Sequence, residues 1–169
     1  MEKLLEIMWK TYEDIGGWIK FSDTKAAAIL ATNGAILAIV FSKSIDNADF
    51  LLKNGILLSS LSLGFLSGLV SIFCAIRCLS PTIDFGEPNS FIYFGHIAKK
   101  YDNKDRFNID VIRTFRDESE FVNQITNQVW INSKVALQKY INVTWAIRFF
   151  VGLIFFFALA GFELVYLFR

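Results

Sequence analysis

The chain of 169 residues is strongly apolar: 54% of its residues are hydrophobic, 16% are aromatic, and its mean hydropathy is +0.43. These values exceed those of an ordinary soluble domain and indicate an integral membrane protein. The formal net charge of +1 excludes the strongly basic surface of a typical nucleic-acid-binding protein. We therefore expect membrane lipid, and no nucleic acid, as a partner.

The first 25 residues are charged and contain tryptophan, so they do not read as a secretory signal peptide. Apolar residues at helical spacing predict an amphipathic helix over residues 2–15, which the Gly16-Gly17 pair is expected to interrupt. Trp18 suits the boundary between membrane and water. We assign residues 1–25 to an interfacial N-terminal helix on the cytoplasmic side.

Two uncharged stretches, residues 26–41 and 55–76, predict a transmembrane hairpin over residues 26–76. A bilayer core of about 30 Å requires roughly 20 apolar helical residues, so the second stretch is long enough to span it. The first is marginal, and it spans the core if Lys25 and Lys43 extend their ammonium groups to the two interfaces.

Small residues recur along both predicted spans. They are Ala27, Ala31 and Ala35 in the first span, and Gly64 and Gly68 in the second. Such faces allow helices to approach closely, so we predict packing or gating roles for these residues. Asn33 lies near the middle of the first span, and its need for polar surroundings predicts that the protein self-associates.

Residues 77–148 are rich in arginine and lysine and predict a cytoplasmic helical region after the hairpin. Pro81 and Pro88 indicate an ordered turn, because proline removes a backbone donor and disfavours helix before it. A short helix is expected to follow over about residues 90–101.

From Asp110 onward the apolar residues fall on one face of a long predicted helix. The same register puts Glu118, Asn132 and Lys139 on that face. These polar side chains are expected to have partners, since a buried polar group without one is costly.

A stretch rich in phenylalanine predicts a third transmembrane helix over residues 149–169. Glu163 lies within it and is a candidate for a gating role, although it also lies close enough to the terminus to extend to the outer interface. The sequence thus predicts an all-α, multi-pass integral membrane protein with about three transmembrane helices, a cytoplasmic N-terminus and a cytoplasmic helical region.

No catalytic motif is recognisable: the sequence has a single histidine and lacks a Walker loop, a dinucleotide-binding glycine fingerprint, a zinc-binding histidine pair and a nucleophile elbow. We therefore expect no enzyme activity. Cys74 and Cys78 lie one helical turn apart near the predicted cytoplasmic end of the second span, where the compartment is reducing, so we expect no disulfide. No second pair of ligands accompanies them, so we expect no metal site.

Three segments provide charged side chains together with aromatic or amide ones: residues 18–25 at the predicted membrane base, residues 93–100, and residues 132–139 of the long predicted helix. Interfacial anchoring, a structural histidine and hydrogen bonding between helices would explain them. Alternatively, their basic groups bind an anionic ligand while an aromatic ring stacks on a planar base. The candidate ligand-binding residues, together with one arginine at the end of the second span, are Lys20, Asp23, Lys25, Arg77, Phe94, His96, Lys99, Asn132 and Lys139.

Residues 18–35, which read WIKFSDTKAAAILATNGA, resemble the signature opening of Pycsar transmembrane effectors. Residues 77–81, 94–97 and 128–139 are similar to other recurrent blocks of that family, so the resemblance covers nearly the whole chain. It implies an anti-phage role in the bacterial inner membrane. A partner cyclase would make cyclic UMP or cyclic CMP on infection, and the effector would impair the membrane and cause abortive infection.

The same resemblance implies a cyclic pyrimidine nucleotide as activating ligand, with no other cofactor. We expect it to bind cytoplasmic helices of two or more subunits in a homo-oligomer. Two other functions fit the sequence: a constitutive membrane scaffold or accessory subunit, and an unregulated holin-like toxin. The elaborate region between the second and third spans favours a protein that receives an input.

Overall fold

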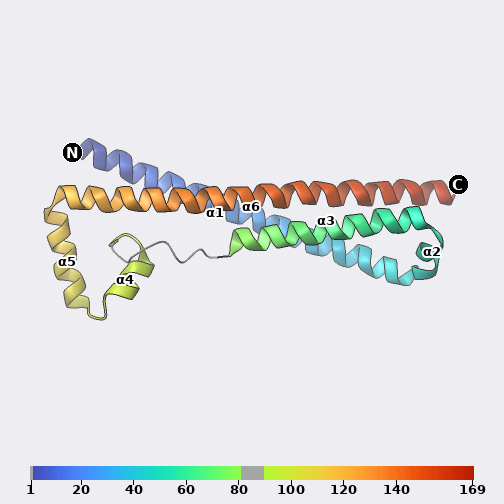
Figure 1. Cartoon of the computed structure of the whole chain (residues 1–169), viewed down its shortest axis with the longest axis horizontal. Coiled ribbons are helices and arrows are strands. Elements are labelled where there is room, and N and C mark those ends of the chain that lie inside the picture. The colour runs from blue at the N-terminus through green and yellow to red at the C-terminus, as the bar shows by residue number, and fades with distance from the viewer. Residues whose placement is uncertain (1, 81–89) are drawn as a thin grey trace. The chain divides into compact units, whose positions relative to one another are not determined.

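The computed structural model describes residues 2–80 and 90–169, and these residues form six helices and no strand (Figure 1). In chain order the helices are α1 (Glu2–Asp46), α2 (Ala48–Lys53), α3 (Gly55–Leu79), α4 (Phe94–Lys100), α5 (Lys104–Arg116) and α6 (Glu118–Leu167). Three of them, α1, α3 and α6, are long and apolar enough to cross a membrane. The predicted all-α membrane protein with three transmembrane helices is therefore confirmed.

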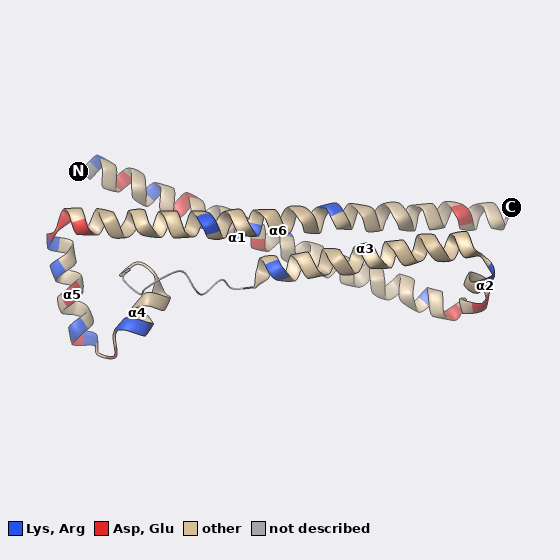
Figure 2. Ribbon diagram, in the orientation of Figure 1, with Lys and Arg blue, Asp and Glu red and all other residues tan. Residues whose placement is uncertain are grey.

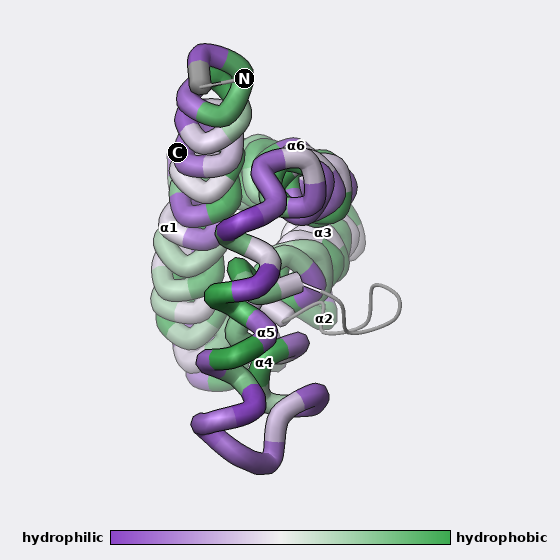
Figure 3. Tube along the Cα trace, turned by 90° about the vertical axis from the view of Figure 1, so that its left-hand side faces the viewer, coloured by the Kyte–Doolittle hydropathy of each residue, from purple (hydrophilic) through white to green (hydrophobic). Residues whose placement is uncertain are grey.

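Charged residues are unevenly distributed over the helices (Figure 2). α3 carries only Arg77, near its end, whereas both signs of charge are interspersed along the first part of α1 and along α5. Hydrophobic and hydrophilic residues alternate along α5 (Figure 3), as expected of an amphipathic helix. The segments suited to a bilayer are therefore α3 and the uncharged parts of α1 and α6.

The predicted interruption at Gly16-Gly17 is wrong, because α1 continues through both glycines. Glycine disfavours a helix interior by about 1 kcal/mol relative to alanine, and no proline is present to remove a backbone hydrogen bond. A 45-residue helix with good helix formers on both sides tolerates that cost. The predicted N-terminal helix and first span are consequently parts of one helix.

The single long helix expected from Asp110 is also wrong, because the chain breaks at Asp117 between α5 and α6. Asp117 is extended and accepts hydrogen bonds from the backbone N–H groups of Ser119, at 3.0 Å, and Glu120, at 3.2 Å. An aspartate that caps the next helix in this way competes with continuation of the previous one. The Ser119 hydroxyl donates to the same carboxylate oxygen at 2.7 Å and is the largest cause of the lowered pKa of Asp117, followed by the Glu120 N–H.

The short helix after the two prolines is smaller than predicted. α4 begins at Phe94, four residues later than expected, and residues 90–93 are not helical. Tyr93 at its start and Tyr101 at its end are both extended. The predicted turn at Pro81 and Pro88 lies outside the described residues.

Two compact units make up the chain. We call Ser22–Ser80 with Lys139–Arg169 the bundle unit, and Met1–Phe21 with Pro81–Gln138 the arm unit. α1 and α6 each contribute residues to both units, since each helix is continuous.

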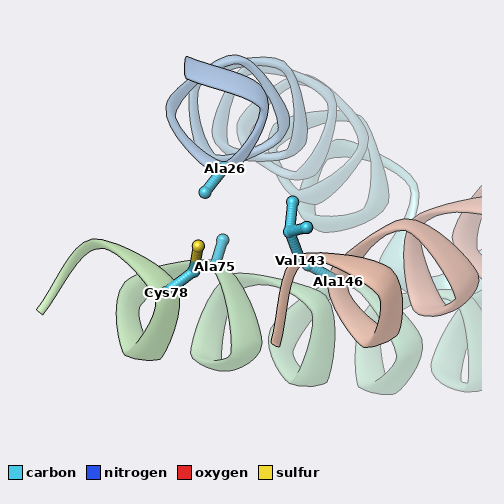
Figure 4. Packing of buried hydrophobic residues seen from close by; sticks show 5 residues of the cluster. All are labelled: Ala26, Ala75, Cys78, Val143 and Ala146. Atoms are coloured by element: carbon cyan, nitrogen blue, oxygen red, sulfur yellow. The ribbon is translucent and has the colours of Figure 1, made fainter. Parts of the chain in front are cut away.

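Small side chains form the core at one end of the bundle unit. Ala26 of α1, Ala75 and Cys78 of α3, and Val143 and Ala146 of α6 are at most 2% exposed, and their side chains point toward one another (Figure 4). Such small groups let three helix backbones approach closely, which increases van der Waals contact where the surrounding lipid supplies no hydrophobic driving force.

Two serine hydroxyls join α3 to α6 farther along the bundle unit. Ser67 Oγ donates to the carbonyl of Phe149, and Ser71 Oγ donates to the carbonyl of Ala146, both at 2.7 Å. Hydrogen bonds between membrane helices contribute on average about 0.6 kcal/mol each. They therefore fix the register of the helix pair more than they add to its stability.

Both glycines singled out in the second span, Gly64 and Gly68, are buried in α3. A Cβ atom added at Gly68 would lie 2.5 Å from Leu153 Cδ1 and 2.9 Å from Leu37 Cδ2. The amide of Asn33 on α1 approaches the Gly68 carbonyl at 3.5 Å. Gly68 therefore lies where all three helices of the bundle meet.

The small-residue face predicted for the first span lies on the other side of α1 from its packed face. The buried residues of α1 are Ser22, Ala26, Asn33 and Leu37. The exposed residues include Ala27, Ala31, Gly34 and Ala35. Small side chains occur on both faces, so composition alone did not distinguish them. The packing or gating role of Ala27, Ala31 and Ala35 stays a prediction.

Candidate functional site

The segment before α4 is hydrogen-bonded both to α6 and to α4 itself. The backbone N–H of Phe91 donates to Gln124 Oε1 at 3.0 Å, and that of Ser90 donates to His96 Nδ1 at 3.3 Å. Ser90 Oγ in turn accepts from the N–H of Ile92 at 3.1 Å. Residues 90–92 are therefore paired although they belong to no helix.

An aromatic cluster connects this segment to α5. The ring centroids of Phe91, Tyr101 and Phe107 lie 5.3 to 6.2 Å apart. The hydroxyl of Tyr101 donates to Asp110 Oδ2 at 2.9 Å, and burial is the largest cause of the raised pKa of this tyrosine. These contacts join the end of α4 to α5 beside a hollow that both helices line.

That hollow is a cavity of about 1210 Å³ in the arm unit, lined by residues of α4, α5, α6 and the segment before α4. Small-molecule pockets commonly measure about 300–1,000 Å³, so a nucleotide is well within its capacity. The charged and amide side chains of the lining are the cations Lys100, Arg113 and Lys134, the carboxylates Asp110, Asp117 and Glu120, and the amides Asn123, Gln124, Asn127 and Gln128.

The cavity is electrostatically polarised along α6. Its wall begins with two carboxylates, at Asp117 and Glu120, continues with amides, and ends at Trp130 and Lys134. With a rise of about 1.5 Å per residue, the wall extends about 25 Å along the helix. Because like charges repel, an anionic group is favoured at the Lys134 end and disfavoured beside the carboxylates.

Gln128 presents an unused acceptor in this wall. The residue is 2% exposed, its Nε2 donates to Asn132 Oδ1 at 3.1 Å, and its Oε1 is buried without a hydrogen-bond partner. Gln124, one turn earlier, uses both ends of its amide, accepting from Phe91 and donating to Glu120. A buried acceptor without a partner is costly, so it marks a place where a ligand donor would be stabilised.

His96 lies at the edge of the same cavity and is 9% exposed. Burial, followed by the charge of Lys99, lowers the pKa of its imidazole below the ordinary value of 6.5. Because Nδ1 accepts from the Ser90 N–H, the neutral ring carries its proton on Nε2. Protonation of Nδ1 would break that bond.

We expect the stability of the arm unit to decrease on acidification through His96. Since the pKa of His96 is lower in the folded chain, the unfolded chain takes up the proton first as the pH falls. The contribution of His96 to the free energy of unfolding is therefore complete above about pH 6.5 and decreases as the pH falls toward the lowered pKa. Thermal unfolding of the full-length protein in detergent between pH 7.5 and 5 tests this. His96→Asn, which keeps an acceptor for Ser90, should show a shallower pH dependence; a slope equal to that of the unchanged protein would contradict the assignment.

One of the nine predicted ligand-binding residues, His96, lines the cavity. Phe94 and Lys99 are exposed on α4 and do not line it. Asn132 is half-buried and does not line the cavity, but it accepts the hydrogen bond from Gln128, which does. Lys20 belongs to the arm unit and is likewise not part of the lining.

The remaining four predicted ligand-binding residues, Asp23, Lys25, Arg77 and Lys139, belong to the bundle unit. Lys139 Nζ donates to Asp23 Oδ1 at 2.5 Å and to the Cys78 carbonyl at 2.6 Å, so one ammonium group joins α6 to α1 and α3. The Cys78 thiol donates to the Ser22 carbonyl at 3.8 Å and the Lys139 carbonyl at 3.5 Å. These contacts describe a structural ion pair. Within the described residues, no group of three or more His, Cys, Asp or Glu side chains could hold a metal ion.

Glu163, the predicted gating residue, contacts α3 inside the bundle unit. Its Oε1 accepts from Ser60 Oγ at 3.1 Å, and its Oε2 is buried without a hydrogen-bond partner. The Oδ1 atom of Asn33 is also buried and unpaired. Two polar groups of the bundle therefore retain acceptor capacity that this chain leaves unsatisfied.

Sequence reasoning missed most of the cavity lining. Two adjacent amide pairs, Asn123-Gln124 and Asn127-Gln128, recur four residues apart and therefore lie on one side of a helix. This spacing was the available signal. The spacing did not reveal that α4 and α5 would lie opposite these amides, since their approach to α6 brings together residues that are distant in the chain.

Comparison with known proteins identifies one family. A model described as the Pycsar effector protein domain (PycTM) matches residues 7–165. No curated protein and no solved structure matches the chain.

Proposed function

The chain belongs to the Pycsar effector family, and from that premise we propose that cyclic UMP or cyclic CMP activates it as an anti-phage membrane effector. Binding takes place in the cavity of the arm unit. The activated protein impairs the integrity of the bacterial inner membrane and so causes abortive infection. The nucleotide comes from a partner cyclase and is a ligand, so no catalytic step is assigned to this chain.

The cavity is the observation that carries the nucleotide-binding part of this proposal. A cyclic mononucleotide has one negative charge, a polar base edge and a flat aromatic ring. The cavity offers lysines and an arginine for the charge, amides for the base edge, and the rings of Phe91 and Trp130 for apolar contact. Its volume of about 1210 Å³ also leaves room for the sugar.

The membrane part of the proposal is supported by the three helices that are long and apolar enough to span a bilayer. Arginine and lysine outnumber acidic residues next to the predicted spans on the side of residues 77–148, which favours a cytoplasmic position for that region and for the N-terminus. Nucleotide made in the cytoplasm would then have direct access to the arm unit.

Activation requires that the ligand bind one state of the protein more tightly than another. Moving a two-state population from about 1% to 99% requires a difference of roughly 5.5 kcal/mol in binding free energy. Several equivalent sites in a homo-oligomer would share this requirement. The exposed small-residue face of α1 would allow close packing of a second copy.

Leakage from liposomes tests the proposal. Purified full-length protein is reconstituted in vesicles filled with a fluorescent dye and titrated separately with cyclic UMP, cyclic CMP, cyclic AMP and cyclic GMP, with linear UMP and CMP as controls. We expect leakage with a cyclic pyrimidine nucleotide alone. Vesicles that stay tight with every nucleotide would indicate a scaffold or accessory subunit, and leakage without any nucleotide would indicate an unregulated toxin.

A further inference from the structure

We propose that Gln128 and Lys134 form the two ends of the nucleotide seat within the cavity, and that this seat prefers cyclic CMP to cyclic UMP. The inference rests on the proposed function, because it assumes that the cavity holds a cyclic pyrimidine nucleotide. It adds which end of the cavity receives the base, which receives the phosphate, and which base is preferred.

The base end is assigned to Gln128 because its amide is both buried and incompletely used. With Nε2 donating to Asn132, the amide presents only an acceptor, Oε1, which lacks a partner among the described residues. A residue that is 2% exposed obtains little hydration for this oxygen. A ligand that donates a hydrogen bond here replaces no existing protein contact.

A single hydrogen-bond acceptor distinguishes cytosine from uracil, because the two bases arrange the donors and acceptors on their edges differently. Cytosine carries its amino donor at the outer corner, beside one acceptor nitrogen. Uracil carries its N–H between two carbonyl oxygens, so an acceptor that approaches it also approaches two oxygens of the same partial charge. The acceptor of Gln128 is therefore better matched to cytosine.

The phosphate end is assigned to Lys134 from the distribution of charge. Lys134 lines the cavity six residues after Gln128, about 9 Å farther along the helix, and its Nζ lies 3.5 Å from the Trp130 ring centroid. Its side chain is exposed, so it can turn from the ring toward a bound phosphate. Arg113 is the less favourable cation, because Asp110 and Asp117 lie one turn before and after it and also line the cavity.

Isothermal titration of the full-length protein in detergent, with each of four cyclic nucleotides, tests both ends. The unchanged protein should bind cyclic CMP about tenfold or more tightly than cyclic UMP, as expected when one base-specific hydrogen bond decides the preference. Gln128→Met, which keeps the length of the side chain and removes the acceptor, should lower affinity for cyclic CMP about tenfold and abolish the preference.

Lys134→Gln should weaken binding of cyclic CMP and cyclic UMP equally, by about tenfold, and reduce the dependence of affinity on salt concentration. Lys99→Gln is the matched control, because Lys99 is exposed on α4 and does not line the cavity. It should bind both nucleotides as the unchanged protein does.

Failure of this inference is distinguishable from failure of the proposed function. If the unchanged protein binds a cyclic pyrimidine but prefers cyclic UMP, or if Gln128→Met and Lys134→Gln bind like the unchanged protein, the assignment of the seat is wrong while the proposed function stands. If the unchanged protein binds no cyclic nucleotide, the proposed function and the seat both fail. Circular dichroism of each variant confirms that loss of binding does not reflect loss of folding.

Discussion

Asp23→Asn is expected to destabilise the bundle unit by about 3 kcal/mol, because it leaves the buried ammonium group of Lys139 without a counter-charge. The side chain of Lys139 is 10% exposed, whereas that of Asp23 is 37% exposed, so the lysine loses most when the pair is broken. The double variant Asp23→Asn/Lys139→Met should recover much of the loss, because methionine has a similar length and needs no charged partner.

Denaturation of the full-length protein in mixed detergent micelles, followed by circular dichroism, measures these differences. Asp46→Asn is the matched control, since it removes the carboxylate of an exposed ion pair with Lys43 whose two side chains are 58% and 76% exposed. That change should alter the free energy of unfolding by less than about 0.5 kcal/mol. Equal effects of Asp23→Asn and Asp46→Asn would show that the Lys139 pair does not stabilise the bundle.

Gly68→Leu is expected to destabilise the bundle by about 2–3 kcal/mol through overpacking. Even a Cβ atom at this position would lie 2.5 Å from Leu153 and 2.9 Å from Leu37, which come from two different helices. Because neither helix can move away without parting from the other, the added side chain forces the three-helix contact open.

Gly161→Leu gives the matched control in α6, because Gly161 is exposed and a Cβ there would meet no atom within 4 Å. We expect this variant to unfold with the same free energy as the unchanged protein, or a slightly higher one, since leucine favours a helix over glycine. The comparison uses the same detergent denaturation. Equal destabilisation by both substitutions would mean that Gly68 matters for helix flexibility and not for close packing.

Hydropathy predicted the fold class because long apolar runs have few stable alternatives to helices in a membrane. The helix ends were less predictable, since they depend on local competition. The cap at Asp117 overcame an apolar pattern that continued across it, whereas the glycines at positions 16 and 17 did not end a helix that both neighbouring segments favoured. Only the first of these outcomes had a sequence signal, the aspartate with a glutamate three residues later.

The candidate site was less predictable than the fold, because charged residues that attract attention in a sequence can pair with each other on folding. Lys139 and Asp23 were proposed as ligand contacts, yet they pair with each other. Gln128 has no charge and was not selected, yet it lines the cavity and its Oε1 is a buried acceptor without a partner. Which group pairs with which is decided by contacts between distant residues, and periodicity does not contain that information.

The two cysteine thiols of the chain lie in different chemical environments although one helical turn separates them. Cys78 is fully buried where α1, α3 and α6 meet, with its thiol directed at two carbonyls, while Cys74 is partly exposed. While the three helices stay together, alkylating reagents reach Cys74 but not Cys78. They reach Cys78 only when the helices separate. The ratio of modification at Cys78 to that at Cys74 therefore reports how often this end of the bundle opens. Cys74, on the same helix, serves as the internal reference.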